Sequence, residues 1–213
     1  MKRNERKERA YTVQRLRRKI SNMLWEFRLG VTTRGIVDML SSPDAYYYST
    51  MPYSAIMPIL EYLELTRDDV FIDIGCGKGR VICCAARHDV REVVGVDKSK
   101  EMCVIAAANA ARLRHRLSPV TVVNCTAQEF DYSEGTAFFL FNPFDEAITR
   151  VVLAQIERTL SVKPRALRFA YANPSHESVF GENRWLEKYD FWDVHDRNRS
   201  IYVPVSFWRS KPK

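Results

Sequence analysis

Three glycines alternate with other residues directly after a short apolar segment. Residues 70–74 form that segment, and Gly75, Gly77 and Gly79 follow within the next five positions. A short apolar run that ends in glycines is typical of a buried parallel strand that leads through a tight turn into a helix. Glycine lets the backbone turn sharply and lets a ligand lie against it, because no Cβ stands in the way. The pattern therefore predicts the floor of a site for a nucleotide-like ligand.

Two aspartates accompany this turn. Asp73 stands inside the predicted strand, where a buried carboxylate needs a cationic or hydrogen-bonding partner. An ammonium group on a ligand would serve, and so would a buried arginine or nearby backbone N–H groups. Asp97 ends the next predicted strand, where a carboxylate can accept hydrogen bonds from both hydroxyl groups of a ribose. Together with the glycines, Asp97 predicts a ligand that contains a ribose.

The glycine spacing differs from two common phosphate-binding motifs. The dinucleotide motif Gly-x-Gly-x-x-Gly would need a glycine at the position of Arg80. The phosphate loop would need Ser or Thr after Lys78, but Gly79 follows it. Both differences argue against a pyrophosphate ligand.

Predicted strands and helices alternate over most of the chain. This alternation is typical of a parallel sheet with helices on both faces. The last two predicted strands have no helix between them and flank a turn at residues 196–199, so the sheet is expected to end in an antiparallel hairpin. Pro204, in the second of them, indicates a sheet edge or a bulge. Strands are expected at residues 70–74, 92–96, 120–124, 137–141, 167–172, 191–194 and 201–207, and helices at residues 52–65, 80–87, 100–116 and 146–160.

The N-terminal 29 residues predict a basic helical arm. Residues 1–28 hold ten Lys and Arg side chains and three Glu, whereas the rest of the chain is balanced in charge. Two interpretations stay open. Either the helix contacts RNA, DNA or an acidic lipid surface, or it packs its apolar stripe on the body and leaves its charges in water. The apolar residues at helical spacing are Val13, Leu16, Ile20, Met23, Leu24 and Phe27.

The segment between arm and body contains turn signals and aromatic residues. Residues 30–35 predict a turn, followed by a short helix at 36–40 and a loop at 41–44. Thr50 can cap the helix that starts near Pro52. We expect the arm to occupy residues 1–45 and one domain to occupy residues 46–213.

The totals are compatible with one α/β domain, since the chain has 213 residues and 46% apolar content. No apolar run approaches the length of a membrane span, and the basic N-terminus lacks the apolar core of a secretory signal. The five cysteines include no Cys-x-x-Cys pair. We therefore expect reduced thiols in a cytoplasmic protein, without a metal site.

The segment from Phe71 to Arg80, together with Gly95-Val96-Asp97, resembles the first two motifs of class I S-adenosylmethionine-dependent methyltransferases. The resemblance covers about residues 46–208 and includes the terminal hairpin. It implies a three-layer Rossmann-like fold with a seven-stranded, mostly parallel sheet. More narrowly, residues 30–35, 73–80 and 141–144 resemble small bacterial-type methyltransferase-domain proteins without a defined substrate.

The resemblance implies S-adenosyl-L-methionine as the cofactor and gives several residues a role in holding it. Asp73 would orient the methionine amine, Asp97 would hold the ribose hydroxyls, and Lys98 would flank the adenine. The family often has an acid for the adenine amino group where Thr126 stands, so either Thr126 or Gln128 could act there as a neutral acceptor. Other expected cofactor contacts are Gly75, Cys76, Gly77 and Gly79 in the glycine turn, Ala127, and Asn142.

Tyrosines precede the domain where such enzymes often fold a cap over the cofactor. Residues 46–48 are all tyrosine. Tyr48 and Thr50 are expected cofactor contacts, with tyrosine hydroxyls reaching the cofactor's carboxylate, and packing in the core is the equally open alternative.

A second motif, Asn142-Pro143-Phe144, ends the fourth predicted strand. Amino-methylating relatives have Asn/Asp-Pro-Pro-Tyr/Phe there, in which the Asn side chain and a Pro carbonyl accept hydrogen bonds from the target amine and the ring stacks on the substrate. This chain has one proline instead of two, so Asn142 could instead contact only the cofactor while Pro143 shapes the turn. His176, after the fifth strand, is either a base or a bystander.

Three functions follow from these residues, all based on S-adenosylmethionine. The first is methyl transfer to an RNA or DNA base, with the basic arm on the phosphates. The second is methyl transfer to a protein or small molecule. The third is a non-catalytic cofactor-binding module. We expect an enzyme that methylates nitrogen.

Overall fold

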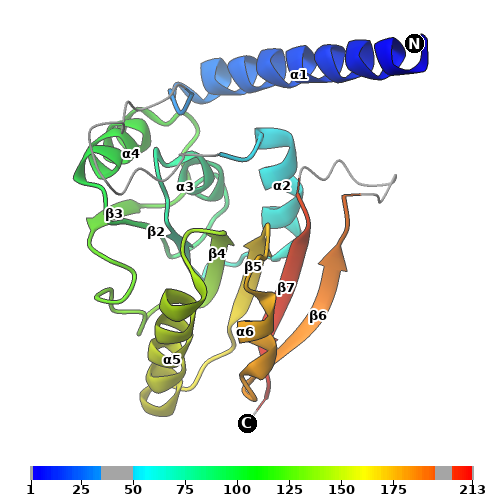
Figure 1. Cartoon of the computed structure of the whole chain (residues 1–213). Coiled ribbons are helices and arrows are strands. Elements are labelled where there is room, and N and C mark those ends of the chain that lie inside the picture. The colour runs from blue at the N-terminus through cyan, green and yellow to red at the C-terminus, as the bar shows by residue number, and fades with distance from the viewer. Residues whose placement is uncertain (1, 35–49, 195–202, 213) are drawn as a thin grey trace.

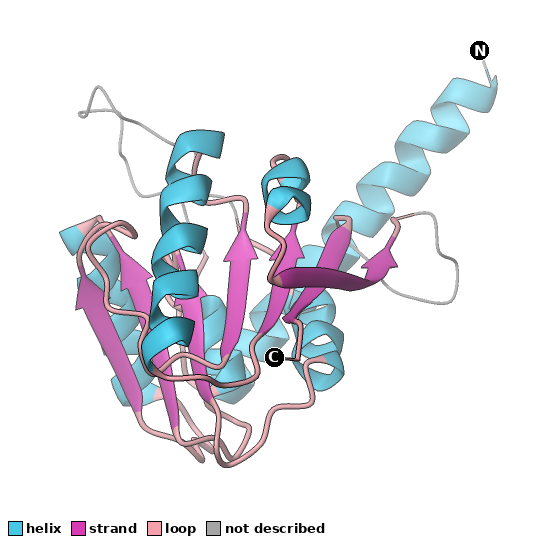
Figure 2. Cartoon of the chain, turned by 90° about the horizontal axis from the view of Figure 1, so that it is seen from below, coloured by secondary structure: helices cyan, strands magenta, loops and turns pink. Residues whose placement is uncertain are grey.

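Seven strands form a single sheet in the computed structural model, which describes residues 2–34, 50–194 and 203–212 (Figure 1). Helices cover both faces of the sheet (Figure 2), as the alternation predicts. The strands are β1 (Val70–Ile74), β2 (Glu92–Asp97), β3 (Val120–Asn124), β4 (Ala137–Phe141), β5 (Arg168–Ala172), β6 (Leu186–Trp192) and β7 (Val205–Ser210). The helices are α1 (Lys2–Leu29), α2 (Tyr53–Tyr62), α3 (Arg80–Ala85), α4 (Lys100–Arg112), α5 (Glu146–Val162) and α6 (Glu177–Glu182).

The strand order is β3-β2-β1-β4-β5-β7-β6, with β1 to β5 parallel and β7 antiparallel to both of its neighbours. The chain builds outward from β1 to β3 on one side and then crosses to β4 on the other side. Ligands of open α/β sheets bind at the carboxyl ends of the strands where the order reverses in this way. The fold therefore directs a ligand to the carboxyl ends of β1 and β4.

Two hydrophobic cores, one on each face of the sheet, hold the layers together. Alternate residues of β1 supply both cores, since Phe71 packs with α2 and α3 on one face and Ile72 packs with α5 and α6 on the other. Helix α2 buries Ile56 and Ile59, as its spacing predicts. Helix α5 buries Ile156 on the opposite face.

The terminal hairpin is present, but both of its strands are shifted from their predicted positions. Strand β7 begins at Val205, directly after Pro204, because proline lacks the N–H that a strand paired on both sides must donate. It is an interior strand, so the expectation of a sheet edge at Pro204 is wrong. Strand β6 begins earlier than predicted because an irregularity between Lys188 and Asp190 interrupts its alternation.

Helix α2 does not use Thr50 as its cap, which corrects that prediction. The N-cap position is Pro52, without a side-chain hydrogen bond. The helix ends at Tyr62, three residues earlier than predicted, because Glu64 adopts a left-handed conformation with φ of 48°. Helix α6 was absent from the sequence prediction.

The apolar stripe of α1 faces away from the domain. The six residues Val13, Leu16, Ile20, Met23, Leu24 and Phe27 are all exposed, from 44% for Ile20 to 75% for Phe27. Glu26 and Leu29, on another face of the helix, are buried. The interpretation in which the arm packs its apolar stripe on the body is therefore wrong.

A buried ion pair joins the last turn of α1 to the start of α3. Arg80 Nη2 donates to Glu26 Oε1 over 3.3 Å, and both side chains are only 3% exposed. Arg80 also donates to the Thr33 hydroxyl and to the Met51 carbonyl, and its guanidinium lies 4.6 Å from the Tyr53 ring centroid. One side chain thus holds α1, the segment after it and α2 together.

The segment at residues 31–34 lies against the glycine turn. Asn109 of α4, fully buried, accepts from the Thr32 N–H and donates to the carbonyls of Thr32 and Lys78. Lys78 Nζ donates to the Arg34 carbonyl over 3.1 Å. These contacts fix the end of the arm to the loop that follows β1.

Several predictions fall on parts of the chain that the structure leaves undescribed. They are the helix at residues 36–40, the loop at 41–44, the tyrosines at 46–48 and the turn at 196–199. The boundary at residue 45 falls there too and stays a prediction. Within the described residues, no helix is both long and apolar enough to cross a membrane.

Candidate active site

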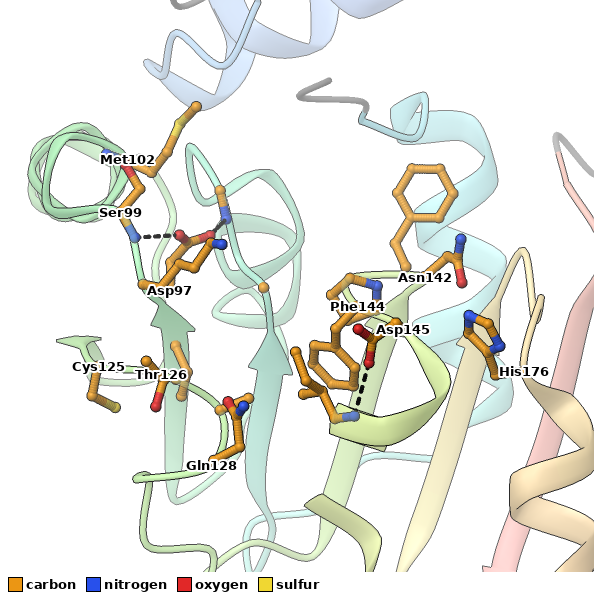
Figure 3. A pocket seen from close by; sticks show the side chains of 18 of the residues that line it. Asp97, Ser99, Met102, Cys125, Thr126, Gln128, Asn142, Phe144, Asp145 and His176 are labelled. Atoms are coloured by element: carbon orange, nitrogen blue, oxygen red, sulfur yellow. Dashed lines mark hydrogen bonds between the residues drawn. The ribbon is translucent and has the colours of Figure 1, made fainter. Parts of the chain in front are cut away.

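A cleft of about 750 Å³ opens at the carboxyl ends of β1 to β5 (Figure 3). Its walls come from the loops after these five strands and from the first turns of α4 and α5. Most of the predicted site residues line it. They are Gly75, Gly77, Asp97, Lys98, Thr126, Ala127, Gln128, Asn142, Pro143 and Phe144, and His176 joins them.

The glycine turn has the conformation that its sequence predicts. Gly75, Gly77 and Gly79 have φ angles of 85°, 52° and 81°, in the left-handed region that glycine adopts readily. The N–H groups of Gly75 and Cys76 donate to the Val96 carbonyl, which ties the turn to β2. A Cβ at Gly75 would lie 2.7 Å from the Pro143 Cβ, so the turn and the loop after β4 approach each other as closely as glycine permits.

Asp97 connects the glycine turn to α4. Its Oδ2 accepts from the Gly77 N–H over 2.9 Å, and its Oδ1 accepts from the Ser99 N–H over 2.8 Å (Figure 3). Ser99 in turn caps α4 by accepting from the Met102 N–H. Each carboxylate oxygen keeps a second lone pair, which is available to a ligand hydroxyl.

Asp73 is a buried acid without a protein partner. It is 3% exposed, and no residue in the described part of the chain forms a hydrogen bond or ion pair with its side chain. Burial, and then the charge of Asp97, raise the pKa of the Asp73 carboxyl well above its ordinary value. The neighbouring arginine, Arg80, pairs with Glu26 instead. A ligand ammonium group would therefore give Asp73 the partner that the protein does not supply.

The loop after β3 forms the far wall of the cleft. The Thr126 hydroxyl donates its proton to Glu129 over 2.8 Å, so toward a ligand it can act only as a hydrogen-bond acceptor. The Gln128 side chain lies at the cleft (Figure 3), while its backbone carbonyl accepts from Gln155 of α5. Both neutral acceptors predicted for the adenine amino group are thus present at this wall.

Asn142 adopts a left-handed conformation, with φ of 41°, directly before a proline. A residue before proline is restricted, and a left-handed one is strained unless its surroundings hold it. Tyr171 of β5 provides part of that support, since its buried hydroxyl donates to Asn142 Oδ1 over 3.2 Å and accepts from the His176 N–H over 3.3 Å. Asn173 repeats the pattern on the neighbouring strand, with φ of 50° before Pro174.

Some cleft residues were missed by the sequence analysis. Asp145 caps α5 by accepting from the Ile148 N–H over 2.9 Å, and both line the cleft. An Asp directly before a predicted helix is a recognisable capping signal, but nothing in the sequence showed that this helix starts at the site. Met102, which lines the cleft, and Tyr171, which bonds to Asn142 behind it, also escaped notice, because apolar spacing predicts them only as core residues.

Other predicted contacts do not line the cleft. Thr50, Asp73, Cys76 and Gly79 lie outside its lining, although Cys76 and Gly79 belong to the glycine turn that forms its floor and Asp73 precedes that turn by two residues. Tyr48 lies outside the described residues. Their roles toward a cofactor stay predictions.

Comparison with known proteins agrees with this geometry. Residues 71–163 match the family model described as a methyltransferase domain. A protein-lysine N-methyltransferase of Saccharolobus islandicus (strain REY15A) is 32% identical over 95 residues, a match that covers 44% of this chain and 58% of that protein. The chain thus matches little more than half of the length of this curated relative.

Solved structures share the fold at low sequence identity. An RNA methyltransferase from Salinibacter ruber, in complex with S-adenosyl-L-homocysteine, has a TM-score of 0.58 and 20% identity, over 78% of this chain and 95% of that chain. A SAM-dependent O-methyltransferase from Thermotoga maritima has a TM-score of 0.58 and 19% identity, over 78% of this chain and 68% of that chain.

The sheet order, the glycine turn and the carboxylates at β1 and β2 are similar to those of class I, S-adenosylmethionine-dependent methyltransferases. The match of residues 71–163 to the methyltransferase-domain model agrees with this resemblance. The residues of the site fit the cofactor. Asp73 lacks a partner, which an amino group would supply, and Asp97 offers hydrogen-bond acceptors to a ribose. Gly75 has no Cβ, which would otherwise fill the narrow space between the glycine turn and Pro143.

Cys125 provides a chemical probe of the cleft. It lines the cleft and is partly exposed, whereas the other four cysteines are buried and all five are free thiols. We expect a maleimide to modify Cys125 first, and S-adenosylhomocysteine to slow this reaction. Burial raises the pKa of the Cys125 thiol, so the labelling rate should increase with pH. Mass spectrometry after timed labelling measures both effects. Labelling of Cys125 at the same rate with and without the ligand would contradict a cofactor site here, and Cys125→Ala is the control.

Proposed function

We propose that the chain transfers the methyl group of S-adenosylmethionine to an amine nitrogen, and that lysine side chains of proteins are the acceptors. The observation that carries the proposal is Asn142-Pro143 at the cleft, strained at Asn142 and closely packed on Gly75. Strain that surrounding contacts maintain is common at functional sites. The relative named protein-lysine N-methyltransferase supports the choice of lysine.

Different residues along the cleft would bind the three portions of the cofactor. Asp73 and the glycine turn would hold its amino-acid portion, Asp97 its ribose, and the wall at Thr126 and Gln128 its adenine. When bound, S-adenosylmethionine supplies a methyl group on a positively charged sulfur, which makes that group reactive toward a lone pair. The protein then has to align the acceptor and keep water away.

Asn142 and Pro143 would orient the acceptor amine. Once the lysine ammonium group has lost a proton to solvent, Asn142 Oδ1 and the Pro143 carbonyl can accept hydrogen bonds from the two N–H groups of the neutral amine and leave its lone pair free for the transfer. The Tyr171 hydroxyl occupies one lone pair of Asn142 Oδ1 and leaves the other for the substrate. Tyr171 is thus a positioning residue, which acts on the substrate through Asn142.

Methyl transfer from labelled cofactor into separate pools of protein, RNA and metabolites tests the acceptor. We expect label in the protein pool, and loss of that label when the lysine amines of the pool have been blocked beforehand by reductive methylation. Label in RNA instead, or label in protein that mild base releases as an ester would be released, would contradict a lysine acceptor.

Replacing Asn142 by glycine tests the mechanism, because glycine tolerates the left-handed backbone and removes only the amide. We expect kcat to fall about a hundredfold, with little change in the affinity for S-adenosylhomocysteine measured by calorimetry. Tyr171→Phe, which removes one hydroxyl, should give a smaller loss of kcat. An unchanged kcat in Asn142→Gly would contradict the role of Asn142.

A further inference from the structure

The exposed stripe of α1 forms a continuous apolar surface on the side of the helix opposite the domain. At 3.6 residues per turn, its six residues fall within an arc of roughly 100°. Glu26 and Leu29, which anchor the helix, fall on another side and are buried. In both Figure 1 and Figure 2 the N-terminal end of α1 extends well beyond the body, so the domain does not cover the outward face.

Positive charges border this stripe on both sides. Lys19 lies along one edge, and Arg17 and Arg28 lie along the other, and all three are exposed. At the domain end, the Arg114 guanidinium lies 6.0 Å from the centroid of the Phe27 ring. Between residues 9 and 28 the sequence has a single acid, Glu26, which is buried in the ion pair with Arg80. The outward face therefore combines an apolar centre with edges whose charges are all positive.

A second copy of the chain fits this surface poorly. Val13, Leu16, Ile20, Met23 and Phe27 follow the alternating three- and four-residue spacing of a coiled coil. The spacing spans only about two heptads, fewer than the three to four that indicate a coiled coil, because Arg6 and Arg9 occupy the preceding positions. The flanking charges of two copies would also repel. A nucleic acid would contact the cations but would leave the apolar centre in water.

We propose that α1 lies flat on an anionic lipid membrane, with its stripe at the level of the acyl chains and its flanking cations among the headgroups. An apolar face between rows of Lys and Arg is the arrangement of helices that bind membrane interfaces. The long cationic side chains can reach outward to phosphate groups while their stems stay on apolar surface. This binding is independent of methyl transfer and would hold the catalytic cleft close to a membrane.

Vesicle flotation of the full chain tests the proposal. We expect the protein to float with vesicles of phosphatidylcholine and phosphatidylglycerol in equal amounts, and to stay unbound with pure phosphatidylcholine. Added salt should weaken the binding, because the cations interact with headgroups across water. The variant Leu24→Glu/Phe27→Glu changes two exposed residues and should lower the vesicle affinity at least about tenfold. Deleting α1 is a poorer test, since it removes Glu26 from the buried pair with Arg80.

A matched control carries the same substitution on another helix. Val151 and Val162 of α5 are 45% and 88% exposed, so Val151→Glu/Val162→Glu adds the same two charges at exposed apolar sites away from α1 and should bind the vesicles as the parent protein does. Circular dichroism and S-adenosylhomocysteine binding check that every variant is folded. The proposal is overturned if the parent protein fails to float with anionic vesicles, or if the α1 variant floats as well as the control. It is also overturned if the stripe instead mediates a concentration-dependent dimer that leaves the protein unbound to lipid.

Discussion

Replacing Arg80 by methionine is expected to lower the free energy of unfolding by about 3–5 kcal/mol. The substitution leaves Glu26 buried at 3% exposure without its ion-pair partner, and it removes the hydrogen bonds to the Thr33 hydroxyl and the Met51 carbonyl. Arg34 remains beside Glu26, but its side chain is 48% exposed and lies at the surface end of the pair. Chemical denaturation followed by circular dichroism measures the change.

The surface ion pair between Arg67 and Asp89 supplies the control. Arg67 is 84% exposed, so Arg67→Met should cost less than about 1 kcal/mol. Changing Glu26 to leucine together with Arg80→Met removes both charges and should recover part of the stability. A loss in Arg80→Met no larger than in Arg67→Met would show that the buried pair does not fasten α1 to the domain.

Changing Asp73 to asparagine is expected to stabilise the unliganded protein at neutral pH and to weaken S-adenosylhomocysteine binding by roughly 10- to 150-fold. The binding loss follows because a neutral amide replaces the charge opposite the ligand's ammonium group. The stability gain follows because burial raises the pKa of Asp73 in the folded state. Calorimetry and denaturation of the same two proteins measure both effects.

The direction of the Asp73 pKa change determines how the stability of the protein depends on pH. A carboxyl whose pKa is raised by folding contributes stability at pH values below its ordinary pKa, and this contribution is lost as the pH rises toward the folded value. The unliganded parent should therefore lose stability on going from about pH 4 to about pH 8 relative to Asp73→Asn. Its affinity for the ligand should rise over that range, because ligand binding favours the ionised carboxyl. Asp68→Asn, at an exposed position, is the control, and equal pH profiles in parent and Asp73→Asn would refute the role of Asp73.

The sheet was predictable because its signals are local. Residues 70–74, 120–124 and 137–141 are each a short apolar run that ends at a polar or turn residue, and the observed strands have these same bounds. The errors occur where tertiary contacts decide. Strand β6 contains an irregularity that breaks its alternation, and α6 is a six-residue helix without a capping side chain.

The floor of the site was also predictable, whereas its supports were not. Glycine at three alternate positions has few other uses, so the left-handed turn could be foreseen. In contrast, Tyr171 is separated by 29 residues from Asn142, and Arg80 by 54 from Glu26. Pairs that are so far apart along the chain leave no pattern in a single sequence, because each partner alone has the features of an ordinary core or surface residue.

The separation of Glu26 from Arg80 has a consequence for the order of events during biosynthesis. At about 5–20 residues per second, a ribosome adds Arg80 roughly 3–10 seconds after Glu26. Throughout that interval the first helix lacks its buried ion-pair partner, since the strand and glycine turn that position the arginine are not yet made. The arm therefore joins the domain only after β1 and α3 have emerged, and until then its apolar stripe and its cations are presented to the cell on a tether.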